Sequence, residues 1–149
     1  MPLVSRRKLI YDTNVYIRAM HYGPASREYS LLQTSLPSTF LASIVSAELK
    51  VGAQDSIGLK LLRQFLSATE RVGRIVVPTY ASWNQAGQTL AAIYKNQPHY
   101  RSKLPALFND ALIVMCALQI GAVICASDKE DFELLHRYRK FDLTLLDEN

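Results

Sequence analysis

Apolar and polar positions follow two different patterns along the chain. Short apolar runs bounded by polar residues have the length of buried strands, whereas longer stretches with apolar residues three and four positions apart have the spacing of amphipathic helices. Gly121, at the end of the most apolar helical stretch, is typical of a helix C-terminus. The predicted strands are residues 8–11, 40–42, 74–77, 122–126 and 141–145, and the predicted helices are 14–21, 26–34, 45–51, 57–70, 80–96, 105–120 and 131–138.

The alternation of strands and helices indicates an α/β fold. Parallel strands need long crossover connections, and helices of this length supply them. Strands that are apolar on both sides are typical of a sheet covered on both faces. We therefore predict a three-layer α/β/α sandwich with a central, mostly parallel sheet. Because no internal repeat or linker-like segment interrupts the pattern, residues 1–149 are expected to form a single domain, with residues 1–7 as a flexible N-terminal arm.

Composition limits the class of protein. A chain of 149 residues with 49% apolar content is long enough for one sizeable core. Cys116 and Cys125 lie in apolar runs without CxxC spacing, so we expect buried, reduced thiols rather than a disulfide framework. No signal-peptide pattern is apparent, and no run reaches the roughly 18 apolar residues of a membrane helix. We expect a soluble cytoplasmic protein with no membrane contact.

Acidic residues follow two of the predicted strands. Asp12 comes directly after the first strand, and Asp128 and Asp131 come after the strand at 122–126. The carboxyl ends of parallel strands line one crevice of an open α/β sheet. If these two strands are neighbours, their acidic side chains share one rim of the sheet.

Two further acids, Glu48 and Asp110, lie in predicted helices. Each acid taken alone has a common structural explanation, as a helix cap or as a charge that complements the helix dipole. Taken together, they would repel one another unless a cation neutralised them. Mg²⁺ and Mn²⁺ prefer oxygen ligands of this kind. An acidic group without His or Cys ligands therefore indicates metal chemistry on phosphates.

The order of these motifs resembles the PIN domain. DTN follows the first strand, SAELKVG forms a helix, NDALIVMCAL opens another, and a strand leads to SDKEDF. Length and spacing are similar to those of the VapC-type toxin ribonucleases of bacterial and archaeal toxin–antitoxin pairs, over nearly the whole chain. The resemblance implies that Asp12, Glu48 and Asp110 match the three best-defined acidic positions of the family and that Asp131 matches the fourth.

The chain departs from the family pattern before its last acid. Many relatives carry a threonine and an asparagine where Ser127 and Asp128 stand. This leaves open whether Asp128 or Asp131 is nearer the metal. A second departure is the lead-in before the first strand, which includes SRRK and is about seven residues longer than in many toxin relatives.

The resemblance implies hydrolysis of RNA that leaves a 5′ phosphate and a 3′ hydroxyl. Thr13 or Ser127 would hydrogen-bond a phosphate oxygen or a ligating carboxylate, or would cap a helix instead. Glu48 would complete the metal shell or orient the attacking water. The predicted catalytic set is Asp12, Glu48, Asp110 and Asp131, and the predicted ligands of Mg²⁺ or Mn²⁺ are Asp12, Asp110, Asp131, Asp128 and Glu48.

The substrate would need positive charge beside this pocket. Residues 95–105, KNQPHYRSKLP, form a predicted basic loop in a stretch without acids. Its candidate RNA-binding residues are Lys95, Tyr100, Arg101 and Lys103, with Tyr100 stacking on an unpaired base. An ordinary solvated loop is the alternative.

The predicted partners follow from the same resemblance. In relatives the region of the helices at 26–34 and 57–70 forms dimers and receives the antitoxin, although core packing also explains most of the apolar residues there. We therefore expect a homodimer and a cognate antitoxin. The alternatives are a PIN-fold RNA-binding or scaffold protein without nuclease turnover, and an unrelated flavodoxin-like domain. The chain has neither a GxGxxG nor a GxxxxGK[ST] phosphate loop, which disfavours the last of these.

Overall fold

The computed structural model describes residues 7–52 and 56–146. Residues 1–6 of the predicted arm lie outside this range, and Arg7 forms an ion pair with Asp142. The strands are β1 (Leu9–Tyr11), β2 (Thr39–Ala42), β3 (Ile75–Val76), β4 (Val123–Ala126) and β5 (Leu143–Leu145). The helices are α1 (Thr13–Tyr22), α2 (Arg27–Ser35), α3 (Ser43–Gly52), α4 (Ser56–Arg71), α5 (Tyr80–Asn96), α6 (Leu104–Ile120) and α7 (Lys129–Tyr138), with the 3₁₀ helices η1 (Leu36–Ser38) and η2 (Pro98–Lys103).

The strands form one sheet in the order β3-β2-β1-β4-β5, and every pairing in it is parallel. Connections from β1 lead outward to β2 and β3, and the chain then crosses to β4 on the other side of β1. In sheets of this kind ligands bind at the carboxyl ends of the two strands where the order reverses. That position here lies between β1 and β4, which pair with Tyr11 opposite Cys125.

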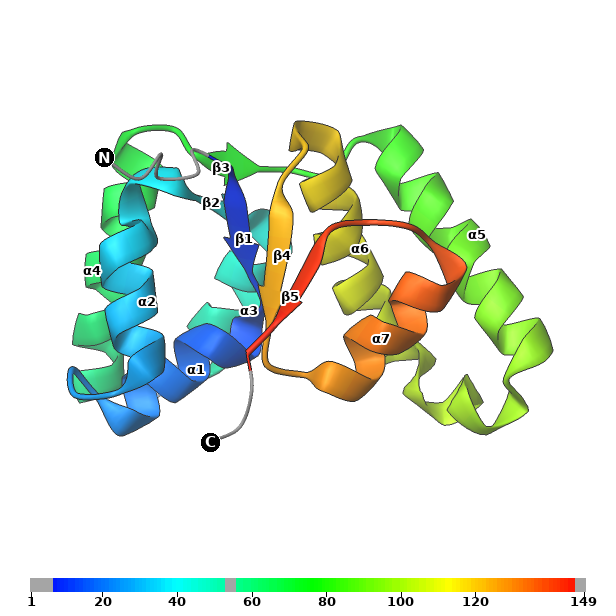
Figure 1. Cartoon of the computed structure of the whole chain (residues 1–149), viewed down its shortest axis with the longest axis horizontal. Coiled ribbons are helices and arrows are strands. Elements are labelled where there is room, and N and C mark those ends of the chain that lie inside the picture. Colours follow the sequence, from blue (N-terminus) through cyan, green and yellow to red (C-terminus); the bar gives the residue numbers. More distant parts are fainter. Residues whose placement is uncertain (1–6, 53–55, 147–149) are drawn as a thin grey trace.

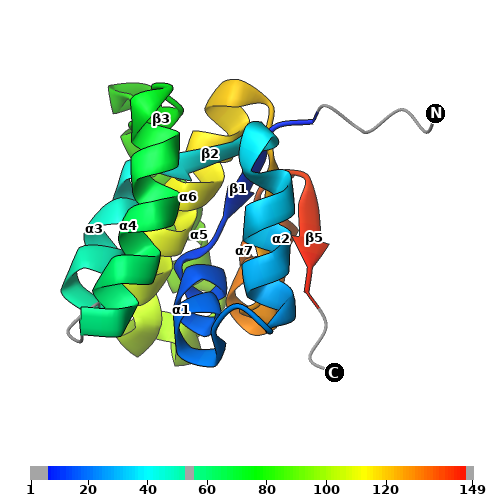
Figure 2. The same ribbon diagram turned by 90° about the vertical axis from the view of Figure 1, so that its left-hand side faces the viewer.

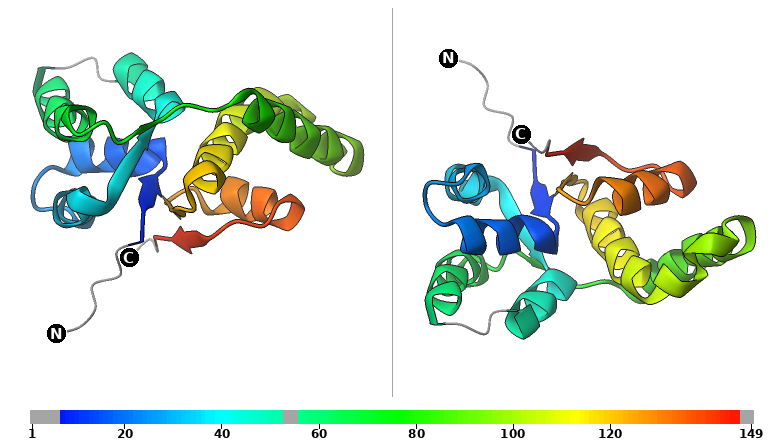
Figure 3. Two further views of the ribbon diagram at one scale, coloured as in Figure 1. Left: turned by 90° about the horizontal axis from the view of Figure 1, so that it is seen from above. Right: turned by 90° about the horizontal axis from the view of Figure 1, so that it is seen from below.

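Helices cover both faces of the sheet (Figures 1 and 3). One face carries α1, α2 and α4, and the other carries α5, α6 and α7. Figure 2 looks onto the first face, with α2 and α4 in front of the strands. Helix α3 packs against both α1 and α6. The predicted α/β/α sandwich is therefore confirmed, with an entirely parallel sheet in the part of the chain that is described.

Helix α6 forms the centre of the core. All residues from Ala111 to Ala117 are buried, including Cys116, and Cys125 is buried in β4. The stretch Pro98–Ile120 is long and apolar enough to cross a membrane by length and composition alone. Packing of α6 against the sheet and its neighbouring helices accounts for that composition, because apolar residues on all sides are typical of a buried helix. Gly121 ends α6 in the predicted left-handed conformation, at φ 66°.

Helix α4 places most of its apolar residues in the core. Leu62, Phe65 and Leu66 are buried, whereas Ile57 is 73% exposed. Core packing, the simpler of the two explanations weighed above, thus accounts for most of the apolar side chains of this helix.

The structure differs from the predictions at several element ends, and two of these differences lie near Asp110 and Asp131. Residues 98–103, predicted within a loop, form η2, which runs directly into α6. Helix α7 begins at Lys129, two residues before the predicted start, so Asp131 lies in its first turn. Both differences lie beside the acidic residues, and they determine which side chains those residues meet.

Candidate metal centre

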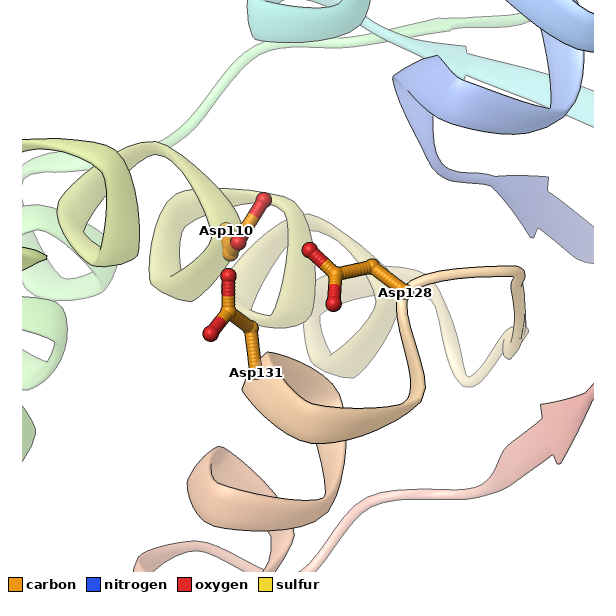
Figure 4. Close-up of side chains that lie close together, drawn as sticks. All are labelled: Asp110, Asp128 and Asp131. Atoms are coloured by element: carbon orange, nitrogen blue, oxygen red, sulfur yellow. The ribbon is translucent and has the colours of Figure 1, made fainter.

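Three carboxylates from different parts of the chain converge at the carboxyl end of β4. Asp110 lies on α6, Asp128 follows β4, and Asp131 lies in the first turn of α7. Each offers one oxygen, and these three oxygens all lie within 4.8 Å of one another. Figure 4 shows the three side chains pointing toward a common point. Both carboxylates face Asp110, so this geometry does not choose between Asp128 and Asp131, and which of them lies nearer a metal stays a prediction.

The helix-cap explanation does not fit Asp110 or Asp128. Asp110 is in the second turn of α6, whose N-cap position is Lys103. Asp128 occupies the N-cap position of α7, but its side chain accepts no capping hydrogen bond. The carboxylates of Asp110 and Asp128 are therefore not committed to stabilising the ends of helices.

Burial and the neighbouring acids both raise the pKa of Asp110. Burial, first of all, and then the charges of Asp131, Asp128, Asp12 and Glu48, in that order of importance, together raise the pKa of this carboxyl to about 8. A carboxyl with this pKa holds a proton at neutral pH unless a cation replaces it. The other four predicted acidic residues therefore all lie close enough to Asp110 for their charges to raise its pKa.

The pKa of Asp131 is likewise raised, to about 6. Burial is the main cause, followed by a hydrogen bond with Asp128 that requires one of the two groups to be protonated, and by the charge of Asp128. Lys103 acts in the opposite direction. A cation between the two carboxylates would remove the cause of this shift in the pKa of Asp131.

One carboxylate oxygen of Asp12 caps a helix, whereas the other has no hydrogen-bond partner among the described residues. Its backbone N–H donates to Cys125 O at 3.1 Å, which holds the end of β1 beside the end of β4. Its Oδ1 caps α1 by accepting from Val15 N at 3.2 Å. The side chain is only 2% exposed, yet Oδ2 has no hydrogen-bond partner among the described residues. Burial raises the pKa of Asp12 to about 6, against the backbone N–H groups of Val15, Ser127 and Asp128, which lower it.

Glu48 is held at the edge of the cluster by Thr13. The Thr13 hydroxyl donates to Glu48 Oε1 at 2.8 Å, which connects the start of α1 to α3. Glu48 is close enough for its charge to raise the pKa of Asp110, although its oxygens are not among the three that lie within 4.8 Å of one another. Thr13 therefore orients Glu48.

Ser127 lies in the wall of an open cavity beside the cluster. Its Oγ is buried and has no hydrogen-bond partner among the described residues. The cavity, of about 400 Å³, is lined by Asn14, Ile17, Arg18, Ser127 and Asp128. The sequence interpretation missed Asn14, Ile17 and Arg18. Their spacing on one face of the helix that follows Asp12 is the signal that was available.

Tyr100 does not have the position predicted for it. Its side chain is buried, at 9% exposure, and its hydroxyl donates to Glu130 Oε1 at 3.1 Å. That hydrogen bond is the main reason why its pKa is raised. Its ring is covered where η2 packs against the rest of the fold, and the stacking of Tyr100 on an unpaired base stays a prediction.

The three cationic candidates remain at the surface. Lys95, Arg101 and Lys103 are exposed. The Arg101 guanidinium lies 4.3 Å from the centre of the Tyr94 ring, and Lys103 Nζ lies 4.0 Å from Glu130 Oε1. Nothing in these contacts prevents the side chains from meeting phosphates, and their role in RNA binding stays a prediction.

Comparisons with known proteins show the fold. No family model matches the chain, and no curated protein matches its sequence. Among solved structures, a chain of VapBC2 from Rickettsia felis, bound to a promoter DNA fragment, is similar at a TM-score of 0.66 and 20% identity, over 93% of this chain and 98% of that one. A chain of DNA-bound VapBC from Salmonella typhimurium is similar at a TM-score of 0.67 and 21% identity, over 93% of this chain and 97% of that one. A chain of FitAcB from Neisseria gonorrhoeae is similar at a TM-score of 0.60 and 19% identity, over 91% of this chain and 95% of that one.

The chain thus has the α/β architecture of a PIN domain. Within that class its fold is VapC-like, since the matches cover nearly the full length of chains from VapBC and FitAB complexes. The predicted resemblance is confirmed for the fold.

Proposed function

We propose that the protein is a Mg²⁺- or Mn²⁺-dependent endoribonuclease that hydrolyses phosphodiester bonds, and that it is the toxin of a type II toxin–antitoxin pair. One observation carries the proposal: carboxylate oxygens of Asp110, Asp128 and Asp131 lie within 4.8 Å of one another. Without a cation this arrangement is unfavourable, as the raised pKa values of Asp110 and Asp131 show.

The donor set suits a hard divalent cation. Every candidate ligand is a carboxylate oxygen, which Mg²⁺ and Mn²⁺ prefer, and the buried Oδ2 of Asp12 has no partner among the described residues. Asp110, Asp128 and Asp131 would hold the ion, with Asp12 directly or through water. A bound divalent cation lowers the pKa of a coordinated water and neutralises charge on the scissile phosphate.

The protein's own residues would prepare this chemistry. Thr13 keeps Glu48 turned toward the cluster, where a carboxylate can orient a water molecule or complete the metal shell. Asp12 is fixed by the β1–β4 pairing, so its position depends on the sheet rather than on a loop. Sites built on rigid elements hold their geometry more closely than sites on loops.

Cleavage of RNA tests the proposal directly. Purified protein is incubated with structured RNA and Mn²⁺ or Mg²⁺, beside the Asp12→Asn and Asp110→Asn variants. Glu133→Gln, an exposed position on α7, is the matched control because it removes an acid from the same helix that carries Asp131. We expect metal-dependent cleavage by the wild type and the control, and a loss of at least about a hundredfold in the two variants.

Two results would contradict the proposal. Cleavage that persists in EDTA would exclude the metal mechanism, and equal cleavage by Asp110→Asn and the wild type would exclude the cluster. RNA binding without cleavage by the wild type would instead support the alternative, a PIN-fold RNA-binding or scaffold protein without turnover.

An inhibitory protein partner belongs to the same proposal. The similar solved chains come from VapBC and FitAB complexes, several of them bound to DNA. We propose a cognate antitoxin, a homodimer and a cytoplasmic location. Co-purification of the chain with the product of a neighbouring open reading frame, with loss of RNA cleavage in the complex, is the expected result.

A further inference from the structure

The cavity lined by Asn14, Ile17, Arg18, Ser127 and Asp128 adjoins the acidic cluster, since Asp128 belongs to both. We term it the α1 cavity. Three of its residues, Asn14, Ile17 and Arg18, lie on one face of α1 at the i, i+3 and i+4 spacing. The other two follow β4, which the β1–β4 pairing places beside the start of α1. A polymer bound at the cluster must continue across the surface next to it, and the α1 cavity is such a surface.

We infer that the α1 cavity binds the nucleotide adjacent to the phosphodiester bond that is cut, with Arg18 on its phosphate. This inference rests on the proposed nuclease function. An arginine guanidinium presents a planar fork of donors that matches a phosphate. The cavity volume of about 400 Å³ lies within the usual range of small-ligand sites.

The remaining residues of the cavity suit the rest of a nucleotide. Ile17 is 40% exposed and offers an apolar surface to a base or ribose. The Asn14 side chain, exposed at the cavity, provides both donors and an acceptor. Ser127 Oγ is buried without a partner among the described residues, and buried hydroxyls usually have one. Because a base inside a duplex is not free to lie against Ile17, we infer an unpaired nucleotide.

The contact between Arg18 and a phosphate does not depend on the metal. The acidic cluster repels phosphates unless a cation is present, whereas Arg18 carries a permanent positive charge. RNA held through Arg18 therefore stays partly bound when the metal is removed. Binding in EDTA and cleavage in Mn²⁺ then report on different parts of the site.

The test compares Arg18→Gln with a matched control. Arg63→Gln, on α4, removes the same charge from an exposed position that lines a different surface cavity, of about 380 Å³. With Mn²⁺ and a short unpaired RNA, Arg18→Gln should raise KM about tenfold with little change in kcat. The slope of log KM against log salt should become shallower by about 0.7, the loss of one phosphate contact. Arg18→Lys should keep the wild-type salt slope, and its KM should lie between those of the wild type and Arg18→Gln.

The second measurement is independent of cleavage. Fluorescence anisotropy with the same RNA in EDTA should show about tenfold weaker binding for Arg18→Gln and no change for Arg63→Gln. If the wild type fails to cleave, the proposed function fails, while a difference between these two variants would still support the cavity. If the wild type cleaves and the two variants behave alike, only the α1 cavity is overturned. Should Arg18→Gln fail to fold by circular dichroism, Arg18→Lys and Ile17→Ala provide the same comparison.

Discussion

Replacing Asp110 by Asn should make the metal-free protein more stable at pH 8, although the same change removes the proposed activity. Burial and four neighbouring acids raise the pKa of Asp110 to about 8, from an ordinary value of 3.8. Between these two values the folded chain holds a proton that the unfolded chain does not. The contribution of Asp110 to the free energy of unfolding therefore falls as the pH rises from about 4 to about 8. Asn is neutral at every pH and avoids that loss.

The magnitude follows from the same pKa. A separation of about four pH units, at 1.36 kcal/mol each, sets an upper limit of roughly 6 kcal/mol. Asp131 and its neighbours are only partly buried and can move apart, which relieves some of the repulsion. We expect Asp110→Asn to gain about 2 to 4 kcal/mol at pH 8 and about 1 kcal/mol at pH 5.

Urea unfolding followed by circular dichroism in EDTA measures both values, with Glu133→Gln as the control that changes neither. Added Mn²⁺ should reverse the order, because an ion that binds only the folded wild type stabilises it. A variant less stable than the wild type at pH 8 in EDTA would refute the reasoning. A gain of equal size at both pH values would refute it too, because a gain that comes from Asp110 must grow as Asp110 ionises.

Four further predictions concern the cluster, the contacts beside it and the C-terminal end of α6. Thr13→Val removes the donor to Glu48 and should lower kcat about tenfold, with stability within about 1 kcal/mol of the wild type, as single-turnover cleavage and thermal melts would show. Mn²⁺ binding at pH 7 should release about one proton and tighten as the pH rises toward 8, measured by calorimetry in buffers of different ionisation enthalpy. Tyr100→Phe should lower the midpoint of thermal unfolding slightly through the lost bond to Glu130, with RNA affinity in anisotropy titrations unchanged. Gly121→Ala should cost about 1 kcal/mol in denaturant melts, because φ is 66° there.

Local pattern predicted most of the fold. The apolar run in β4, the buried α6 and the terminating Gly121 all lie where the sequence placed them, because each is decided by residues close in the chain. The position of Tyr100 could not be read in this way. Its hydroxyl meets Glu130, thirty residues later, so its burial depends on how η2 packs in the folded chain.

The candidate site, too, was predictable where it depends on local sequence and not where it depends on how the chain folds. The sequence identified Asp12, Asp110, Asp128 and Asp131 as candidates, but Asp12 lies near the other three only because β1 and β4 are neighbours. Alternation of strands and helices does not fix strand order. The α1 cavity was missed for a further reason. Arg18 is an ordinary helical residue by its local sequence, and it becomes notable only beside Ser127 and Asp128.

The β1–β4 pairing has a consequence for the making of the protein. It joins Tyr11, near the start of the chain, to Cys125, near its end, and the acidic cluster is completed only by Asp131. A chain on the ribosome therefore exposes Asp12 and Glu48 long before the other half of the centre has been translated. Contacts between such distant segments form late in folding. Under the proposed function, the centre would be assembled only after nearly all of the residues that form it have been translated.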